Sequence, residues 1–180
     1  MVAQAQRIEV AFGASTIDAP AASAAASGNH QPQSLDGGAY LGGSLNVLFL
    51  KKRTVGVQGE FNWKASKEIY LPTELNLPYR PIFWDVNAIW APKLTKRLAA
   101  EFVAGVGAQN TRFYTGACSG GNCFASSNHL MADFGAGIKW YAFKHVFFRP
   151  EGRLYLVNNS VEFTSAHAVR YGASIGYTFR

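Results

Sequence analysis

The chain has 180 residues, of which 48% are hydrophobic, 14% aromatic and only 16% charged. This composition is typical of one strand-rich domain and argues against a soluble helical domain with a Lys/Glu-rich surface. The net charge is +6, but the basic residues form no arm or known nucleic-acid motif, so we expect no nucleic-acid partner. The longest dense apolar stretch, 45–50, is far shorter than the roughly 20 residues of a membrane helix, so any membrane crossing requires strands.

Apolar and polar residues alternate in eight stretches, which is the period of a strand with two different faces. These stretches span residues 6–15, 38–50, 54–64, 81–91, 97–112, 129–141, 145–157 and 167–179. Pro150 removes a hydrogen-bond donor within the seventh stretch, which predicts a local bulge or a weaker strand pairing there. We treat residues 1–180 as one domain, with residues 1–5 as a signal-peptide remnant or a disordered N-terminus.

The connections between these stretches alternate between long and short. Long segments occupy 16–37, 65–80, 113–128 and 158–166, and short turns occupy 51–53, 92–96 and 142–144. Outer-membrane barrels have short periplasmic turns and longer extracellular loops. The sequence therefore predicts an all-β fold, an eight-stranded antiparallel up-and-down transmembrane β-barrel in the bacterial outer membrane, with both termini in the periplasm.

Three features favour a membrane barrel, with its polar face inward, over a soluble barrel of the lipocalin type. The polar face carries many glycines and small residues, which suit a crowded interior. Strand charges keep to that face except Arg112, which lies at a strand end where the cost of facing lipid is low. Aromatic residues of the apolar face lie near strand ends, as in membrane-interface girdles. They are Trp63, Trp84, Trp90, Trp140, Tyr171, Tyr177 and Phe179.

The last ten residues, 171–180, alternate apolar residues and place Phe179 next to the end. They resemble the terminal strand by which the bacterial assembly machinery recognises outer-membrane barrels, although that signal usually ends on the aromatic residue itself. As an architecture, the whole chain resembles the small eight-stranded family of the outer membrane protein A transmembrane domain and the opacity-type surface proteins. The resemblance implies two partners, the assembly machinery through residues 171–180 and outer-membrane lipids, including lipopolysaccharide.

The interior of an eight-stranded barrel is just wide enough to be filled by side chains. Opposite charges are nearly balanced on the polar face, and unpaired buried charges are very costly, so we expect internal ion pairs. Similar networks close the lumen in the outer membrane protein A barrel. The predicted network comprises Glu60, Asp85, Glu101, Asp133, Lys139, Arg149, Glu151 and Arg153, with Glu9, Arg7 and Arg170 as further inward charges. A narrow ion-conducting path through this lumen is the alternative.

Cys118 and Cys123 are separated by four residues rich in Gly and Ser, which favours a local disulfide at the tip of the third long loop. His129 alone is too little for a zinc site, and we expect no metal or cofactor. The long segment 65–80 is unusually apolar, which indicates either a loop folded onto the barrel rim or a contact surface.

Our first functional hypothesis is a non-catalytic structural or surface-interaction barrel whose extracellular partner the sequence does not name. The second is a small channel. The third is an enzyme that modifies lipid A, which would need Ser, His and a carboxylate near the outer rim. The candidates for that chemistry are Ser126, Ser127 and His129, and Ser165 and His167 with Glu162. They match no motif spacing of such enzymes, and we predict that they are ordinary loop residues.

Overall fold

The computed structural model describes residues 6–19, 35–50, 53–70, 77–115, 123–158 and 166–179. Eight long strands make up the barrel: β1 (Arg7–Ala19), β3 (Tyr40–Leu50), β4 (Val55–Lys64), β6 (Leu77–Trp90), β7 (Leu98–Thr115), β8 (Cys123–Tyr141), β9 (Val146–Val157) and β10 (His167–Phe179). Two short strands, β2 (Leu35–Asp36) and β5 (Glu68–Tyr70), pair with β1 and β6. No helix in these ranges is long and apolar enough to cross a membrane.

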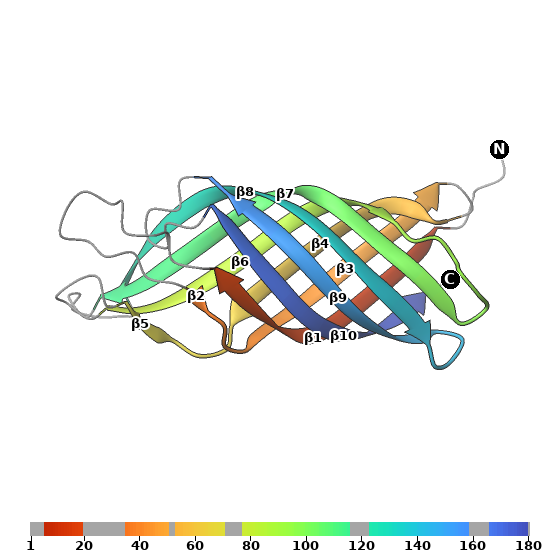
Figure 1. Cartoon of the computed structure of the whole chain (residues 1–180), viewed down its shortest axis with the longest axis horizontal. Helices are drawn as coiled ribbons and strands as arrows, with labels where there is room; N and C mark the ends of the chain where they lie inside the picture. The colour runs from red at the N-terminus through yellow and green to blue at the C-terminus, as the bar shows by residue number, and fades with distance from the viewer. Residues whose placement is uncertain are drawn as a thin grey trace.

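Each long strand pairs antiparallel with the next long strand along the chain. The sheet closes where β1 pairs with β10, from Ile8 opposite Phe179 to Asp18 opposite Val169. The strands run diagonally around the barrel axis, and both β2 and β5 lie at the same end (Figure 1). The predicted fold class, an eight-stranded antiparallel up-and-down barrel, is confirmed.

The two ends of the barrel differ. Three short turns, after β3, β6 and β8, lie at the end where β1 begins and β10 ends (Figure 1). We call this end the short-turn end. The opposite end, where β5 pairs with the start of β6, is the long-loop end. Strands β7 and β8 extend further toward this end than predicted, because they stay paired up to Thr115 and Cys123. Arg112 therefore lies within β7, three residues before its end.

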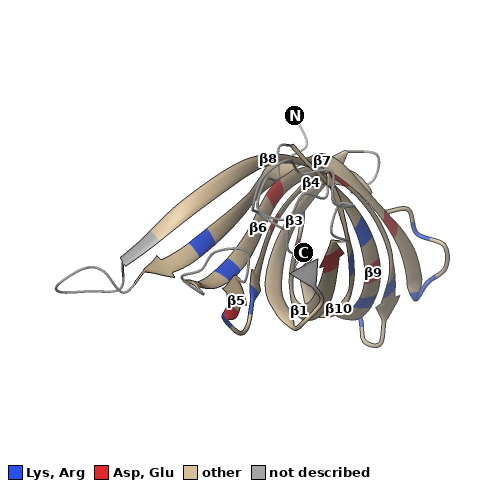
Figure 2. Ribbon diagram, turned by 60° about the vertical axis from the view of Figure 1, so that its left-hand side comes forward, with Lys and Arg blue, Asp and Glu red and all other residues tan. Residues whose placement is uncertain are grey.

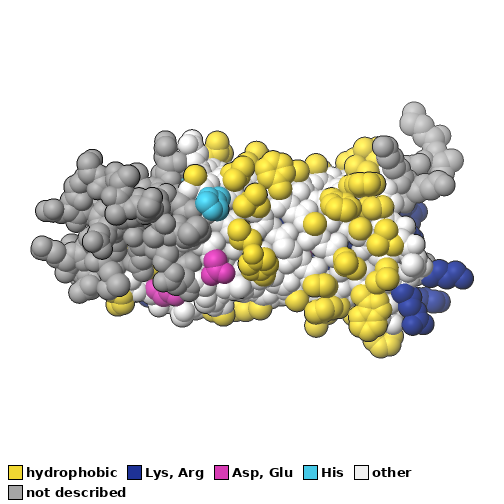
Figure 3. Space-filling model, viewed as in Figure 1, with side chains coloured by type: hydrophobic (Ala, Val, Ile, Leu, Met, Phe, Trp, Pro, Cys, Tyr) yellow, Lys and Arg dark blue, Asp and Glu magenta, His cyan; other side chains and the backbone are white. Residues whose placement is uncertain are grey.

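The structure determines which face is inward, which alternation alone left open. Large apolar side chains point away from the barrel, and many are more than half exposed, including Phe12, Val106, Leu130 and Ile175. Hydrophobic side chains are spread over the outer face between the two ends (Figure 3). Charged and amide side chains on the opposite parity are buried inside. Because water would favour the reverse arrangement, this outer face requires lipid.

Pro150 is accommodated by a local loss of strand pairing. The β8–β9 ladder is continuous from Met131 to Gly137 and resumes at Trp140, but the positions opposite Pro150 and Arg149 are not paired. The register is the same on both sides of this gap, so no bulge is needed. Of the two accommodations predicted from the sequence, the weaker pairing is the one observed.

Candidate functional site

The lumen near the short-turn end holds a chain of ion pairs built on two carboxylates. Glu9 of β1 pairs with Arg7 and with Lys139 of β8, whose Nζ lies 2.5 Å from a Glu9 carboxylate oxygen. Lys139 also pairs with Glu101 of β7, and Arg149 of β9 lies 2.9 Å from the same carboxylate. Tyr141, whose direction the sequence left open, points inward, where its hydroxyl donates to Glu9. These contacts join β1 to β7, β8 and β9 across the interior.

A second group of charges fills the middle of the lumen around Arg153 of β9. Its guanidinium lies 2.5 Å from Glu60, 3.2 Å from Asp133 and 3.6 Å from Asp85. Glu60 belongs to β4, which is diametrically opposite β9 in the strand order, so this pair spans the full width of the barrel. The side chains of Glu60 and Arg153 are both buried inside the barrel. Figure 2 marks the acidic and basic positions along the strands of the wall.

Glu151 links the two groups into one network. It lies 3.3 Å from Arg149, 3.7 Å from Arg153 and 2.6 Å from Arg170 of β10, which also pairs with Glu60. All eight residues of the predicted network thus lie together and each takes part in at least one ion pair. The network also includes Arg170, Glu9 and Arg7, which sequence parity placed inward but which we had left outside the predicted plug.

Aromatic side chains fill the lumen above the charges, toward the long-loop end. Phe83 of β6 stacks on Tyr155 of β9, with ring centroids 5.3 Å apart, and meets the edge of Tyr40 of β3 at 6.0 Å. All three are fully buried, together with Tyr79. We name this group, Tyr40, Tyr79, Phe83 and Tyr155, the aromatic layer. We did not predict it, although each member shares the parity of an inward polar residue, such as Asp85 for Phe83.

The long-loop end of the lumen carries one more ion pair. Lys64, at the end of β4, is fully buried and pairs with Glu68 of β5, which also accepts a hydrogen bond from the Tyr79 hydroxyl at 3.0 Å. Tyr70 of β5 packs edge-on against Tyr79 and Phe113. The part of the apolar segment 65–80 that the structure describes is therefore partly strand, with Tyr70 packed onto the rim.

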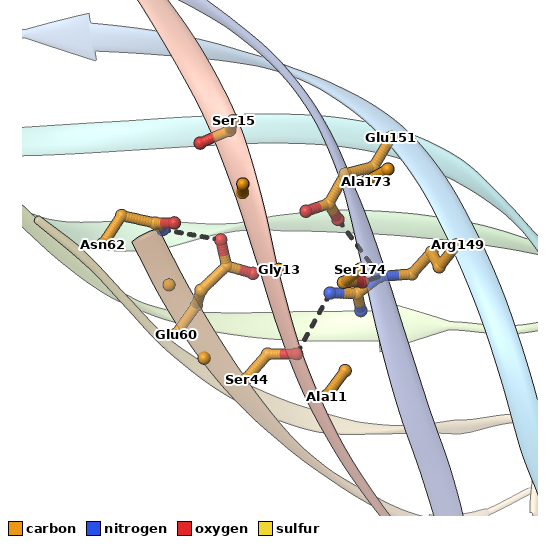
Figure 4. Close-up of a pocket in the computed structure, with 13 residues that line it drawn as sticks. Ala11, Gly13, Ser15, Ser44, Glu60, Asn62, Arg149, Glu151, Ala173 and Ser174 are labelled. Atoms are coloured by element: carbon orange, nitrogen blue, oxygen red, sulfur yellow. Dashed lines mark hydrogen bonds and ion pairs between the residues drawn. The ribbon is translucent and has the colours of Figure 1, made fainter. Parts of the chain in front are cut away.

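A small void lies beside the charges in the middle of the lumen. A cavity of about 20 Å³ lies among Glu60, Asn62, Arg149 and Glu151, next to the glycines of β1 and β3 (Figure 4). The Arg149 guanidinium crosses it to donate to the Ser44 hydroxyl at 3.0 Å. About 10–15 Å³ is enough for one water molecule, so this space fits a structural water and is not a passage.

Comparison with known proteins finds similarity in structure but not in sequence. No protein-family model matches the chain, and no curated protein matches it. The solved structure of Ail, the attachment invasion locus protein of Yersinia pestis, in complex with the heparin analogue sucrose octasulfate, superposes with a TM-score of 0.64 at 12% identity, over 97% of this chain and 99% of that one. The chain has the fold of a small outer-membrane β-barrel.

Two further outer-membrane barrels show the same architecture. Neisserial surface protein A superposes with a TM-score of 0.65 at 8% identity, over 96% of this chain and 97% of that one. The N-terminal barrel domain of Pseudomonas aeruginosa OprF superposes with a TM-score of 0.55 at 17% identity, over 95% and 97%. Identities this low describe the fold and carry no residue-level assignment.

On the outer face of the barrel, the predicted interface aromatics all belong to the outward parity. Trp90, Trp140, Tyr177 and Phe179 lie near the short-turn end, and Trp140 and Phe179 are each half exposed. Trp63 and Tyr171 lie toward the long-loop end, whereas Trp84 lies nearer the middle of β6. The arrangement gives a dense aromatic group at the short-turn end and a sparser one at the other.

The predicted Ser/His candidates at the rim are only partly described. Ser127 and His129 lie two residues apart on β8, with Oγ and Nε2 2.9 Å apart, and Ser126 is exposed on the other face of the strand. His167 begins β10 and is exposed. Ser165 and Glu162 lie outside the described residues, as does Cys118, so the disulfide with Cys123 stays a prediction.

Proposed function

We propose that this chain is an outer-membrane barrel with a closed lumen, whose activity is structural or depends on surface interactions at the long-loop end. The observation that carries the proposal is the ion pair between Arg153 and Glu60, which joins opposite walls of the barrel. The aromatic layer lies above it and the Lys139–Glu9 pair lies toward the short-turn end. An eight-stranded barrel filled in this way leaves the outer surface and the loops as the places for function.

Conductance in planar bilayers tests the closed lumen. The wild-type protein is expected to give no discrete current steps at any voltage. A variant with Glu60, Phe83 and Arg153 all changed to alanine removes the crossing pair and the centre of the aromatic layer, and serves as the positive control. Discrete steps from the wild-type protein would contradict the proposal and support the channel alternative.

The surface role is supported by the presence of surface and attachment proteins among the structures with this fold. With short turns in the periplasm, the long-loop end faces the exterior, surrounded by lipopolysaccharide. Residues 171–180, which include most of β10, are the proposed contact with the assembly machinery.

Replacing residues 20–34 by a short Gly/Ser linker is expected to keep the folded barrel while reducing adhesion of cells that display it. Unchanged adhesion would argue against a role of that segment in adhesion.

The lipid A enzyme remains a second alternative because of one observation, the hydrogen-bond distance between Ser127 and His129. A serine nucleophile needs such a base within reach. Incubation of the folded protein with lipid A, followed by mass spectrometry, decides the question. We expect unchanged lipid A. A modified product that disappears in Ser127→Ala would replace the non-catalytic proposal.

A further inference from the structure

The positive charge of the chain is concentrated at the short-turn end. Seven of the 17 basic residues lie in the segments 51–54, 91–97 and 142–145, which contain no acidic residue. The rest of the chain has ten basic and eleven acidic residues, so the net charge of +6 arises from these turns. Figure 3 shows Lys and Arg side chains gathered at this end.

Six of the described cations converge on one cavity. It has a volume of about 730 Å³, and no acidic residue of the described ranges lines it. Its basic lining residues are Arg7, Arg53, Lys93, Lys96, Arg97 and Lys144. Arg7 pairs with Glu9 deeper in the lumen, whereas none of the other five forms an ion pair with a carboxylate in the described ranges. Clustered cations without counter-charges repel one another, so an anion bound here would be stabilised.

The outer face fixes the depth of this cavity in the membrane. Trp90, Trp140 and Phe179 are each half exposed on the strand ends beside the turns. Such aromatic residues mark the boundary between hydrocarbon and headgroups. The turns themselves expose Leu94 and Phe143, at 61% and 73%, next to the cations. The basic residues therefore lie at the level of the lipid headgroups, where phosphate is the abundant anion.

We infer that the short-turn end binds the phosphate groups of anionic phospholipids in the adjacent leaflet. Arg53 and Arg97 offer planar forks that match phosphate oxygens, and the lysines add point charges. A free phosphate would satisfy the cations alone. A phospholipid also places acyl chains near Leu94 and Phe143, which gives these exposed apolar side chains an apolar contact. The lipid headgroup is thus the source of phosphate that accounts for both kinds of side chain.

The experiment compares short-chain phosphatidylglycerol with phosphatidylcholine of equal chain length, added to the protein folded in zwitterionic micelles. Native mass spectrometry gives the dissociation constant for each. The wild type is expected to bind phosphatidylglycerol at least tenfold more tightly. The triple variant Lys93→Gln, Lys96→Gln, Arg97→Gln should weaken that binding roughly a hundredfold, at about fivefold for each cation near a lipid surface. The gel shift on boiling confirms that the variant is folded.

A matched control removes the same charge from the opposite end through Lys67→Gln, Arg80→Gln and Arg112→Gln, and should keep the preference. Equal binding of the two lipids by the wild type would overturn the proposal, and so would an equal loss in the control. Displacement of phosphatidylglycerol by inorganic phosphate at the same concentration would assign the cavity to a soluble anion and overturn the lipid as its occupant. Persistence of the bound lipid under that competition supports it.

Discussion

Gly107 of β7 shows why small residues occupy so many inward positions. A Cβ atom at this position would overlap the carbonyl oxygen of Trp84 and the backbone of Asp85 on the neighbouring strand β6. Gly59 of β4 lies on the outward parity, and a Cβ atom there meets nothing within 4 Å. The two glycines therefore offer the same substitution in a crowded and in an open site.

We expect Gly107→Ala to lower the free energy of unfolding by about 1–3 kcal/mol, because strand β6 has to shift to admit the methyl group. Gly59→Ala should leave stability unchanged or raise it by up to about 1 kcal/mol, since alanine restricts the unfolded chain. Urea titration of the protein in lipid vesicles measures both. Equal stabilities of the two variants would show that interior crowding does not select glycine here.

Arg153 is the most connected charge in the lumen, with four carboxylates within 4 Å of its guanidinium. Arg153→Met keeps most of the side-chain volume but leaves those carboxylates without their shared partner. Breaking a buried ion pair in this way costs about 3–5 kcal/mol, which urea titration should detect.

The control for this loss is Lys67→Met, which removes an exposed cation at the rim and should cost less than about 1 kcal/mol. The double variant Arg153→Met, Glu60→Gln should recover part of the loss, because one carboxylate is neutralised. If Arg153→Met were as stable as Lys67→Met, the network would be too hydrated to stabilise the barrel.

Strand β8 shows how much of a single strand can be predicted from the sequence. In its C-terminal part, residues 129–141, polar and apolar residues alternate clearly, with Asp133 and Lys139 inward and Trp140 outward. The strand and the direction of these side chains were both predicted correctly there. Its start was predicted at residue 129 and is observed at Cys123. Within the extension, Ser126 and Asn128 on the outward face and Ser127 on the inward face are all polar, so no contrast between the two faces marks these residues as strand. Pairing with β7 forms this extension, including a 2.6 Å hydrogen bond between Asn110 and Asn128.

The aromatic layer was missed for a related reason. Tyr40, Phe83 and Tyr155 share the inward parity, but an interior treated as uniformly polar gives no place for them. Local alternation identifies the face of each residue, whereas the filling of the lumen depends on which side chains meet across the barrel. That depends on register and shear, which no single strand encodes.

The position of the boundary between lipid and water along β8 can be tested by introducing a lysine at two different depths in the membrane. Phe134 points outward halfway between Trp140 and Asn128, and its side chain is half exposed. We expect Phe134→Lys to lower the free energy of unfolding by about 2–4 kcal/mol, because a lysine near the bilayer midplane faces hydrocarbon. Asn128→Lys, outward beyond the apolar belt, should cost at most about 1 kcal/mol.

Unfolding in vesicles of one defined lipid measures both lysine variants. Phe134→Ala provides the reference for loss of the aromatic ring alone. A cost for Asn128→Lys as large as that for Phe134→Lys would move the membrane boundary above Asn128 and make the β7–β8 extension part of the spanning region.

At the scale of the whole molecule, the β1–β10 seam decides whether the sheet has an edge. Eleven consecutive residues of β1 pair with β10, and Ile175 lies within this ladder, opposite Phe12 on one side and Phe148 of β9 on the other. In lipid, an unpaired backbone group costs several kcal/mol, so an open seam would be incompatible with insertion. The seam should therefore be as sensitive to loss of an amide donor as any interior pair of strands.

We expect Ile175→Pro to destabilise the barrel strongly, because proline removes the backbone donor and is tolerated in sheets only at edges and bulges. Ile175→Ala removes the lipid-facing side chain but keeps that donor, and should retain most of the stability. On unboiled gels, the wild type and Ile175→Ala should migrate as the folded form and shift on boiling, while Ile175→Pro should show little or no folded band. A folded Ile175→Pro with an unchanged urea midpoint would mean that the seam behaves as a free edge, and that the barrel is held closed by lumen contacts such as Glu9 with Lys139 and Arg170 with Glu60.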